Sequence, residues 1–317
     1  MKEAVLLIVY NRPEKTKKIL KKLEIAKPPR LYIAADGPNT LKINDSYLVK
    51  ETRKIIQTIR WECKVHYLLR SNNLGCKYAV SQGIDWFFKH ETKGIILEDD
   101  CLPNQDFFIF CENLLNYHKR NKKIFSITGT NFYKKSLVKD ASYYFSIFPN
   151  VWGWATWRRS WKYYDVEMKF WPKYKKTKEW KKFFNENYKR KFFEKAFDQS
   201  FNNKINTWDY QFTALSFMLG GLTATPTKNL IKNIGFGSKS TFNKNSKHRL
   251  ANLKTQSLKK IYHPSSINRC LLSEKFLLKF RFNLSDYIFI RLIFFTKFKL
   301  TTYLKRIITF NTNGKTD

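Results

Sequence analysis

Short apolar runs alternate with polar and helical stretches along the first half of the chain. The runs lie at residues 5–9, 31–35, 65–69, 94–97 and 124–128. Pro13 suits the first turn of a helix after the first run, and charged or amphipathic stretches follow the next three runs. Continuous apolar strands separated by helices are typical of a parallel sheet that is covered on both faces. The pattern predicts an α/β fold with a mixed, mainly parallel sheet flanked by helices.

A polar cluster lies at the end of each apolar run. The clusters occupy residues 10–13, 36–38, 72–75, 98–100 and 129–131. The carboxyl ends of parallel strands meet at one edge of a sheet, and ligands of open α/β sheets bind beyond that edge. The chain contains neither the G-x-G-x-x-G nor the G-x-x-x-x-G-K-[ST] pattern, which argues against a dinucleotide-binding fold or a P-loop. We therefore expect a ligand site of another kind at this edge.

Three consecutive carboxylates, Glu98, Asp99 and Asp100, follow the fourth apolar run. Carboxylate oxygens suit Mg²⁺ or Mn²⁺ better than zinc. Since side chains alternate along a strand, the three cannot all face one ion. We expect Asp100, at the tip, to bind the metal, with Glu98 and Asp99 orienting bound water, ribose hydroxyls or neighbouring side chains. The alternative is that Asp99 or Asp100 caps the helix that begins near Asp106.

The order of these motifs resembles that of the GT-A glycosyltransferases, the nucleotide-diphospho-sugar transferases. The resemblance is carried by N-R-P at residues 11–13, D-G at 36–37, N-L-G at 73–75 and the acidic segment at 97–103. It covers about residues 4–245. The E-D-D triplet and a later W-D pair are distantly similar to animal N-acetylglucosaminyltransferase I.

The resemblance implies roles for several residues at this edge. Asp36 would contact the base or ribose of a nucleotide, Arg12 would lie near its phosphates or uracil, and Asp100 would bind the metal. Further candidates for binding the nucleotide sugar are Asn11, Lys77, Glu98 and Asp99. Simpler explanations stay open, because Asp36 is a good turn residue by itself and Arg12 can be an ordinary surface charge.

Four tryptophans lie close together in the second half of the chain. The flat faces of tryptophan suit sugar rings, and one edge of the indole can stay in water. In the resemblance, a W-G-W segment lies where the donor and acceptor sugars meet, which makes Trp152, Gly153 and Trp154 candidates for sugar binding. The alternative is a tryptophan-rich core. We expect Trp152 or Trp154 to line the site and Trp157 or Trp161 to be buried.

Asp209, in the W-D pair, is the candidate for the catalytic base of an inverting transfer. In a single displacement, one carboxylate removes the proton of the acceptor hydroxyl while the diphosphate leaves from the opposite face. A free aspartate has a pKa of about 3.9, so partial desolvation by Trp208 and Tyr210 should raise the pKa of Asp209. The alternative is that Asp209 caps the helix that follows it.

Two later segments bear on the metal and the phosphates. Residues 228–237 form an apolar run with a glycine-rich exit, but residues 240–242 lack the histidine that many relatives carry there. This difference speaks against a metal or phosphate role for that loop. His263 is a candidate for a late metal ligand, as in some GT-A enzymes. A lone histidine is more often structural, and that alternative stays open.

The composition limits the classes of protein. The aromatic content of 17% is too high for a disordered chain. The formal net charge of +35 favours phosphorylated ligands and anionic lipid surfaces. The lysines are spread along the whole chain, however, so no nucleic-acid partner is expected. Five cysteines without a C-x-x-C pair, no signal peptide and no apolar run of about 18 residues favour a reduced, cytoplasmic setting.

Large apolar residues alternate with cations from residue 275 to 310. This composition is typical of an amphipathic helix that lies on anionic lipid; the alternative is a helix packed on the catalytic domain or on a second subunit. We expect a GT-A domain at residues 1–265, with a nucleotide-binding half (1–131) and an acceptor half (132–265), and a basic aromatic helical tail at 266–317. Such a protein would lie peripherally at the inner face of the cytoplasmic membrane.

These features predict a metal-dependent, inverting glycosyltransferase that uses Mn²⁺ or Mg²⁺. It would move a hexosyl or N-acetylhexosaminyl group from a nucleotide-diphosphate sugar donor to a glycan or lipid-linked glycan acceptor of lipopolysaccharide or capsule type. One rival is a nucleotidyltransferase of similar fold, which would need a glycine-rich phosphate loop that residues 10–14 do not provide. The other is a basic membrane- or nucleic-acid-binding protein without turnover, whose phosphate contacts would weaken steeply with salt.

Overall fold

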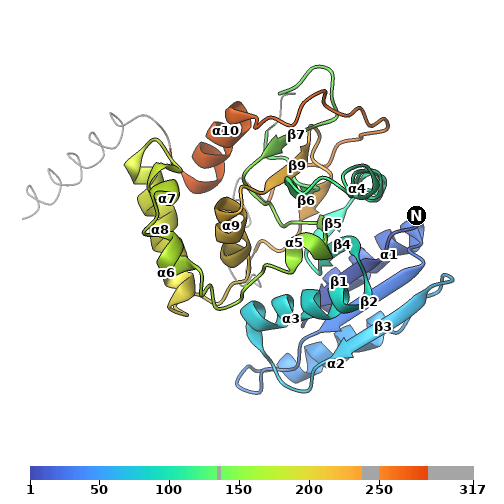
Figure 1. Ribbon diagram of the computed structural model, residues 1–317. Helices are drawn as coiled ribbons and strands as arrows, with labels where there is room; N and C mark the ends of the chain where they lie inside the picture. Colours follow the sequence, from blue (N-terminus) through green and yellow to red (C-terminus); the bar gives the residue numbers. More distant parts are fainter. Residues whose placement is uncertain (134–136, 238–249, 285–317) are drawn as a thin grey trace, which may run out of the picture. The chain divides into compact units, whose positions relative to one another are not determined.

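The computed structural model describes residues 1–133, 137–237 and 250–284. Within these residues an eight-stranded sheet has the strand order β3-β2-β1-β4-β8-β6-β9-β7 (Figure 1). Its strands are β1 (Val5–Val9), β2 (Arg30–Ala35), β3 (Lys64–Leu69), β4 (Lys93–Glu98), β6 (Ile124–Thr128), β7 (Tyr143–Ser146), β8 (Trp154–Trp157) and β9 (Leu222–Pro226). The predicted loop at residues 240–242 and most of the predicted tail lie outside the described residues.

The sheet is mainly parallel. β1, β2, β3 and β4 run in one direction, and β6 pairs with β9 in parallel, whereas β8 and β7 pair antiparallel with their neighbours. The central strands β1, β2 and β6 are almost wholly buried, as expected of strands that are covered on both faces. The predicted α/β fold with a mixed, mainly parallel sheet flanked by helices is therefore confirmed.

Helices cover both faces of this sheet (Figure 1). The helices of the described residues are α1 (Pro13–Ala26), α2 (Asp45–Ile56), α3 (Gly75–His90), α4 (Gln105–Tyr117), α5 (Arg158–Trp161), α6 (Trp171–Tyr174), α7 (Lys178–Lys182), α8 (Asn187–Phe201), α9 (Asp209–Met218) and α10 (Leu271–Phe282). Trp154 and Trp157 show the two faces, because side chains an odd number of residues apart on a strand point opposite ways. Trp154 packs on Phe212 of α9 with ring centroids 5.2 Å apart, while the Trp157 indole donates to the Leu115 carbonyl of α4 at 3.1 Å.

A two-stranded sheet lies beside the end of β4. β5 (Cys101–Pro103) pairs antiparallel with β10 (Ile231–Asn233), so that Asn233 lies opposite Cys101. This pairing brings the glycine-rich exit of residues 228–237 next to the acidic triplet. The sequence analysis identified both segments but did not predict that they pair.

The chain divides into two compact units, residues 1–274 and 275–317. In the first unit, the region from α6 to α8 buries Trp171, Trp180, Phe193 and Phe197, the aromatic inner face of a basic surface. All five cysteines are free thiols. None of the helices in the described part of the chain combines the length and apolar character that crossing a bilayer requires.

Candidate functional site

The turn between β1 and α1 holds Arg12 against the acidic triplet. β1 ends at Val9 and Pro13 begins α1, so Arg12 lies beyond the carboxyl end of β1. Its Nη1 donates to Asp99 Oδ1 at 2.8 Å and to Asp100 Oδ2 at 3.0 Å. Burial lowers the pKa of Arg12, but the charges of Asp99 and Asp100 outweigh it and raise the pKa above its usual value. Arg12 is therefore an ion-paired residue of this edge and not an ordinary surface charge.

The three carboxylates of the triplet have different surroundings. Asp99 is buried and also accepts a hydrogen bond from the Tyr10 backbone N–H at 3.2 Å. Among the described residues, none donates a hydrogen bond to the Glu98 carboxylate. Burial, followed by the charges of Asp100 and Asp99, raises the pKa of Glu98 to about 8. Neither aspartate caps α4, because Asn104 does so by accepting from the Phe107 N–H at 3.1 Å.

Asp209 lies close enough to interact with this triplet. It is the first residue of α9, and Thr207 Oγ1 donates to its Oδ1 at 2.5 Å. Its charge contributes to the raised pKa of Glu98. Burial raises the pKa of the Cys76 thiol, and the charges of Glu98, Asp209 and Asp100 raise it further, so all three carboxylates lie within electrostatic range of Cys76. The N-cap of α9 is Trp208, without a side-chain capping bond, so Asp209 is not the cap.

We call Arg12, Glu98, Asp99, Asp100 and Asp209 the acidic corner. Residues 231–237 form its wall. The Ile234 N–H donates to the Asp100 carbonyl at 2.8 Å, and a Cβ on Gly235 would lie only 2.3 Å from Asp100 Oδ2. Glycine at position 235 therefore lets this segment approach the Asp100 carboxylate.

Asp36 is placed as a turn residue. Its carboxylate accepts hydrogen bonds from the N–H groups of Gly37, Leu74 and Gly75 at 2.9–3.1 Å and from the Asn73 amide at 2.9 Å. It is buried. These bonds tie the end of β2 to the start of α3, which matches the turn alternative and leaves the carboxylate fully engaged.

Lys77 is also engaged within the protein. Its side chain is buried, and Nζ lies 3.0 Å from Glu167 Oε2 and 2.5 Å from Asn203 Oδ1. A buried ammonium needs such a partner, because desolvating an unpaired charge is costly. The Lys77 ammonium therefore joins α3 to the loops that carry Glu167 and Asn203, and its contact with a nucleotide sugar stays a prediction.

Asp45 supports the same edge of the sheet from α2, and the sequence did not single it out. This buried carboxylate at the start of α2 accepts from Tyr10 Oη at 2.6 Å, from the Asn11 amide and from the Asn39 N–H at 2.7 Å. The predicted candidate Asn11 is thus bound to Asp45. In the sequence, Asp45 was one acidic residue in a charged helical stretch, and no local pattern distinguished it.

The tryptophans separate into core and rim. Trp154, Trp157 and Trp161 are 1–3% exposed, so Trp154 is a core residue and not a sugar platform. Trp152 is partly exposed and packs edge-on against Phe132 and Phe236.

Gly153, between Trp152 and Trp154, has a φ of +60°, and a Cβ there would lie 2.4 Å from the Ile231 side chain. Glycine therefore allows this turn to pack on β10. Of the W-G-W segment, Trp152 is the residue that is partly exposed.

His263 is not brought to the acidic corner. Its ring stacks on Tyr117 with centroids 3.5 Å apart, and its Nδ1 lies 2.9 Å from Tyr143 Oη. Tyr117 is the last residue of α4, whereas the acidic triplet precedes the start of that helix. At 1.5 Å per residue, α4 spans roughly 18 Å, so the structural alternative describes His263 better than the metal ligand does.

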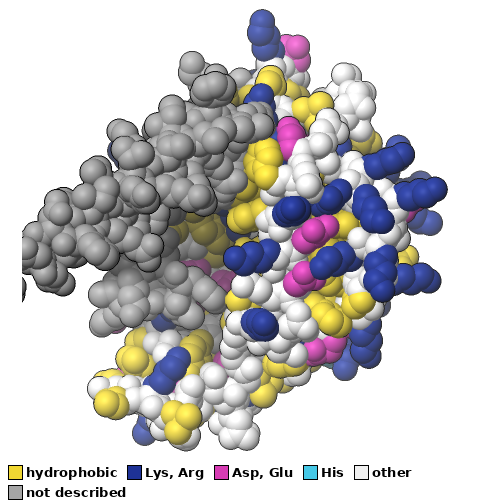
Figure 2. Space-filling model, turned by 90° about the vertical axis from the view of Figure 1, so that its left-hand side faces the viewer, with side chains coloured by type: hydrophobic (Ala, Val, Ile, Leu, Met, Phe, Trp, Pro, Cys, Tyr) yellow, Lys and Arg dark blue, Asp and Glu magenta, His cyan; other side chains and the backbone are white. Residues whose placement is uncertain are grey.

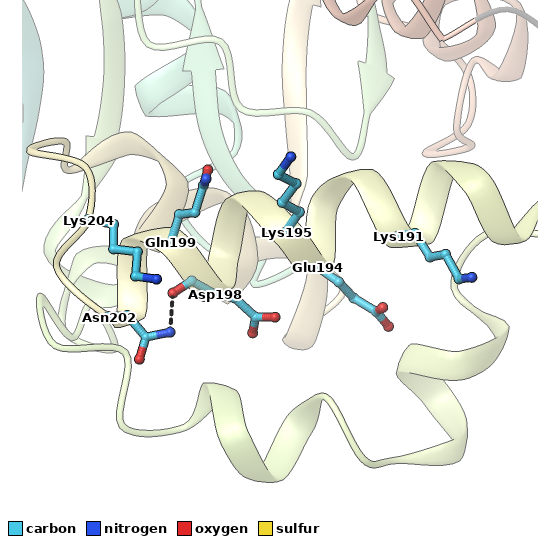
Figure 3. A pocket seen from close by; sticks show the side chains of 7 residues that line it. All are labelled: Lys191, Glu194, Lys195, Asp198, Gln199, Asn202 and Lys204. Atoms are coloured by element: carbon cyan, nitrogen blue, oxygen red, sulfur yellow. Dashed lines mark hydrogen bonds between the residues drawn. The ribbon is translucent and has the colours of Figure 1, made fainter. Parts of the chain in front are cut away.

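A hollow runs along α8 (Figure 3), and none of its lining residues belongs to the acidic corner. It is lined by Lys191, Glu194, Lys195, Asp198, Gln199, Asn202 and Lys204. The Asp198 carboxylate is already bound by the Trp171 indole at 2.8 Å and by Lys175 Nζ at 2.6 Å. This hollow is therefore not a candidate for the functional site.

Comparison with known proteins gives distant similarities in structure. No family model matches the sequence, and no curated protein matches it. HddC from Yersinia pseudotuberculosis is 13% identical, with 54% of this chain and 86% of that chain covered and a TM-score of 0.32. TarS residues 1–349 from S. aureus are 10% identical over 73% of this chain and 59% of that chain (TM-score 0.37). A cytidylyltransferase from Leptospira borgpetersenii is 11% identical over 51% and 63% (TM-score 0.33). Likenesses this distant assign no activity.

Proposed function

We propose that the protein transfers a sugar from a nucleotide-diphosphate donor to a glycan acceptor, by a metal-dependent, inverting displacement. The observation that carries the proposal is the acidic corner. Glu98 and Asp100 come from the end of β4, Arg12 from the end of β1 and Asp209 from the start of α9. Their convergence beyond the carboxyl ends of parallel strands is where α/β sheets bind ligands.

The corner suits a hard divalent cation. Its donors are carboxylate oxygens, which Mg²⁺ and Mn²⁺ prefer. The four carboxylates outnumber the Arg12 charge, and after burial the charges of Asp100 and Asp99 are what raises the pKa of Glu98. No group of three or more His, Cys, Asp or Glu side chains within the described ranges is arranged to hold a metal ion. In our proposal Asp100 would be the direct metal ligand, Glu98 and Asp99 would orient bound water or ribose hydroxyls, and a diphosphate would take the other positions on the metal.

When bound, the cation would neutralise the charge that builds on the departing nucleoside diphosphate. The protein's own groups would do the rest. Arg12 holds Asp99 and Asp100 in place through its two hydrogen bonds. Thr207 donates to one oxygen of Asp209, and the other oxygen would accept the proton of the acceptor hydroxyl. Trp152 would offer an aromatic face to a sugar ring.

The finer assignment follows the family resemblance. We propose a hexosyl or N-acetylhexosaminyl donor and a glycan or lipid-linked glycan acceptor of lipopolysaccharide or capsule type. A lipid-linked acceptor would require the enzyme to work at the inner face of the cytoplasmic membrane.

The test is binding of UDP, alone and with Mn²⁺, to the full chain and to Asp100→Ala, followed by a panel of nucleotide sugars. Mn²⁺ should strengthen UDP binding to the wild type at least roughly tenfold. The affinity of Asp100→Ala for UDP should be the same with and without Mn²⁺. Release of a nucleoside diphosphate from a nucleotide sugar supports sugar transfer. Formation of pyrophosphate from a nucleoside triphosphate and a sugar phosphate would overturn it in favour of nucleotidyl transfer. Equal Mn²⁺ dependence in the two proteins would overturn the metal role of Asp100.

A further inference from the structure

Two aliphatic side chains project from the loop between β2 and α2. Leu41 is 94% exposed and Ile43 is 93% exposed, and Tyr47 in the first turn of α2 is 63% exposed. Leu41 and Ile43 are the most exposed large hydrophobic residues in the part of the chain that the structure describes. Neither side chain packs in the core, and exposing apolar side chains to water is unfavourable. The exposure suggests that something other than water covers them when the protein works.

The backbone of this loop is folded on itself. Leu41 N–H donates to the Asn39 side chain at 3.0 Å, and Lys42 N–H donates to the Asn39 carbonyl at 3.0 Å. The Asn39 N–H in turn binds the buried Asp45 carboxylate. These bonds hold the loop in a defined turn that keeps Leu41 and Ile43 outside the protein.

The charges around the loop are mainly positive. Lys42 lies between the two aliphatic residues, and Tyr47, Lys50 and Lys54 lie on one exposed face of α2. Lys54 is paired with Glu51, but the nearest aspartate, Asp45, is buried. Figure 2 shows one face of the molecule, on which hydrophobic side chains lie beside lysine or arginine side chains in several places.

We propose that residues 38–47 dock on an anionic lipid bilayer, with Leu41 and Ile43 inserted into the interface and Lys42 and Lys50 near the headgroups. Apolar side chains flanked by cations bind anionic membranes in this way. The formal net charge of +35 draws the whole chain to such a surface.

A protein partner explains the loop less well. Two projecting side chains and a tyrosine bury far less than the roughly 1,200 Å² of a stable protein–protein interface. A projecting tip also needs a matching pocket in a protein, whereas a fluid bilayer accepts it without one.

The docking loop is connected to the acidic corner. Asp45 binds Asn39 of the loop and also Tyr10 and Asn11, which precede Arg12. A bilayer in contact with Leu41 would therefore lie close to the corner. That position would suit a lipid-linked acceptor. The link to the acceptor rests on the proposed function, whereas the docking itself does not.

The test is co-sedimentation of the full chain with vesicles of phosphatidylcholine alone or mixed with phosphatidylglycerol. Leu41→Ser/Ile43→Ser is compared with Ile25→Ser/Ile109→Ser, which removes two aliphatic side chains that are 63% and 57% exposed on α1 and α4. At about 0.5 M salt, where charge attraction is screened, we expect the loop variant to bind anionic vesicles roughly tenfold more weakly or worse. The control should bind like the wild type.

Amide hydrogen exchange gives a local readout. Exchange in residues 38–47 should slow when anionic vesicles are added to the wild type. Equal vesicle binding by both double variants, together with unchanged exchange in the loop, would overturn the proposal. Loss of self-association in the loop variant without loss of vesicle binding would overturn it in favour of a second copy of the chain. Hydrolysis of a nucleotide sugar without vesicles should be unaffected, so failure of docking is distinguishable from failure of the proposed function.

Discussion

The Asp100 carboxylate is confined from two sides. Arg12 Nη1 lies 3.0 Å from its Oδ2, and Gly235 packs against the same oxygen. The proposed metal ligand is thus held by an ion pair on one side and by a backbone without a Cβ on the other. Small changes in the side chains on either side should therefore disturb the proposed metal site more than they disturb the packing of the core.

Gly235→Ala tests this confinement. The added Cβ would lie 2.3 Å from Asp100 Oδ2, so the carboxylate must move. We expect Mn²⁺-dependent UDP binding to weaken roughly 10- to 100-fold and the free energy of unfolding to fall by about 1–3 kcal/mol. Titration calorimetry and urea denaturation measure the two effects.

The matched control is Gly220→Ala. A Cβ at Gly220 meets nothing within 4 Å, although its φ of +63° strains an alanine. The control should lose about 1 kcal/mol of stability and bind UDP normally. If both variants bind UDP alike, Gly235 does not shape the site.

Residue types predicted which side chains meet in the acidic corner better than they predicted the hydrogen-bond partners of single side chains. The triplet and Asp209 were candidates because carboxylates at strand ends suit metal and base chemistry. Asp36 and Lys77 were chosen on similar grounds, but their hydrogen bonds depend on Leu74 and Glu167, which are distant in sequence. Such partners are set by tertiary packing and cannot be predicted from local sequence.

At the scale of elements, α9 positions the candidate base. Its first residue is Asp209, and its inner face packs Phe212 against Trp154 of β8. The Tyr164 hydroxyl donates to the Trp208 carbonyl at 3.1 Å, which fixes the residue before the helix. The helix thus presents a carboxylate at its positive end, where a negative charge is stabilised.

Asp209→Asn should separate binding from transfer. The amide keeps the size of the side chain but cannot accept the acceptor's proton. We expect UDP binding within about twofold of the wild type and a fall in kcat of roughly 100-fold or more. The free energy of unfolding should change by about 0.3–1 kcal/mol through the helix terminus. Near-normal turnover would exclude Asp209 as the base.

The sequence predicted the parallel strands well and the antiparallel ones poorly. β1 to β4 and β6 lie within one residue of the predicted apolar runs. β1, β2, β4 and β6 are largely buried and therefore continuous in hydrophobicity, whereas the edge strand β3 is partly exposed and β9, which is parallel to β6, was not predicted. β5 and β10 have three residues each, too few for a periodic pattern. β8 is a strand of four residues, two of which are tryptophan. Their aromatic character indicated a sugar site and not a strand.

At the scale of the whole molecule, a buried histidine links stability to pH. His118 is 3% exposed, and its Nε2 lies 2.9 Å from Tyr143 Oη. Burial lowers the pKa of His118 to about 4. Between pH 6.5 and 4 the unfolded chain therefore takes up a proton that the folded chain does not, and stability falls as pH falls.

We expect this group to remove about 3 kcal/mol from the free energy of unfolding between pH 7 and pH 4. His118→Gln keeps a hydrogen-bonding side chain but does not titrate. Between pH 7 and pH 4 its free energy of unfolding should therefore fall by about 3 kcal/mol less than that of the wild type. His90→Gln, on the exposed end of α3, should behave like the wild type. Urea denaturation at several pH values measures all three. Parallel curves for the wild type and His118→Gln would contradict the assignment.

The place of β8 in the sheet has a consequence for synthesis on the ribosome. β8 lies between β4 and β6 and pairs antiparallel with both, yet it follows both in the chain. Until Trp157 leaves the exit tunnel, β4 and β6 each carry a free backbone edge, which is prone to wrong pairing. A nascent or truncated chain that stops before β8 would therefore depend on chaperones, and residues 1–131 alone would make a poor expression fragment.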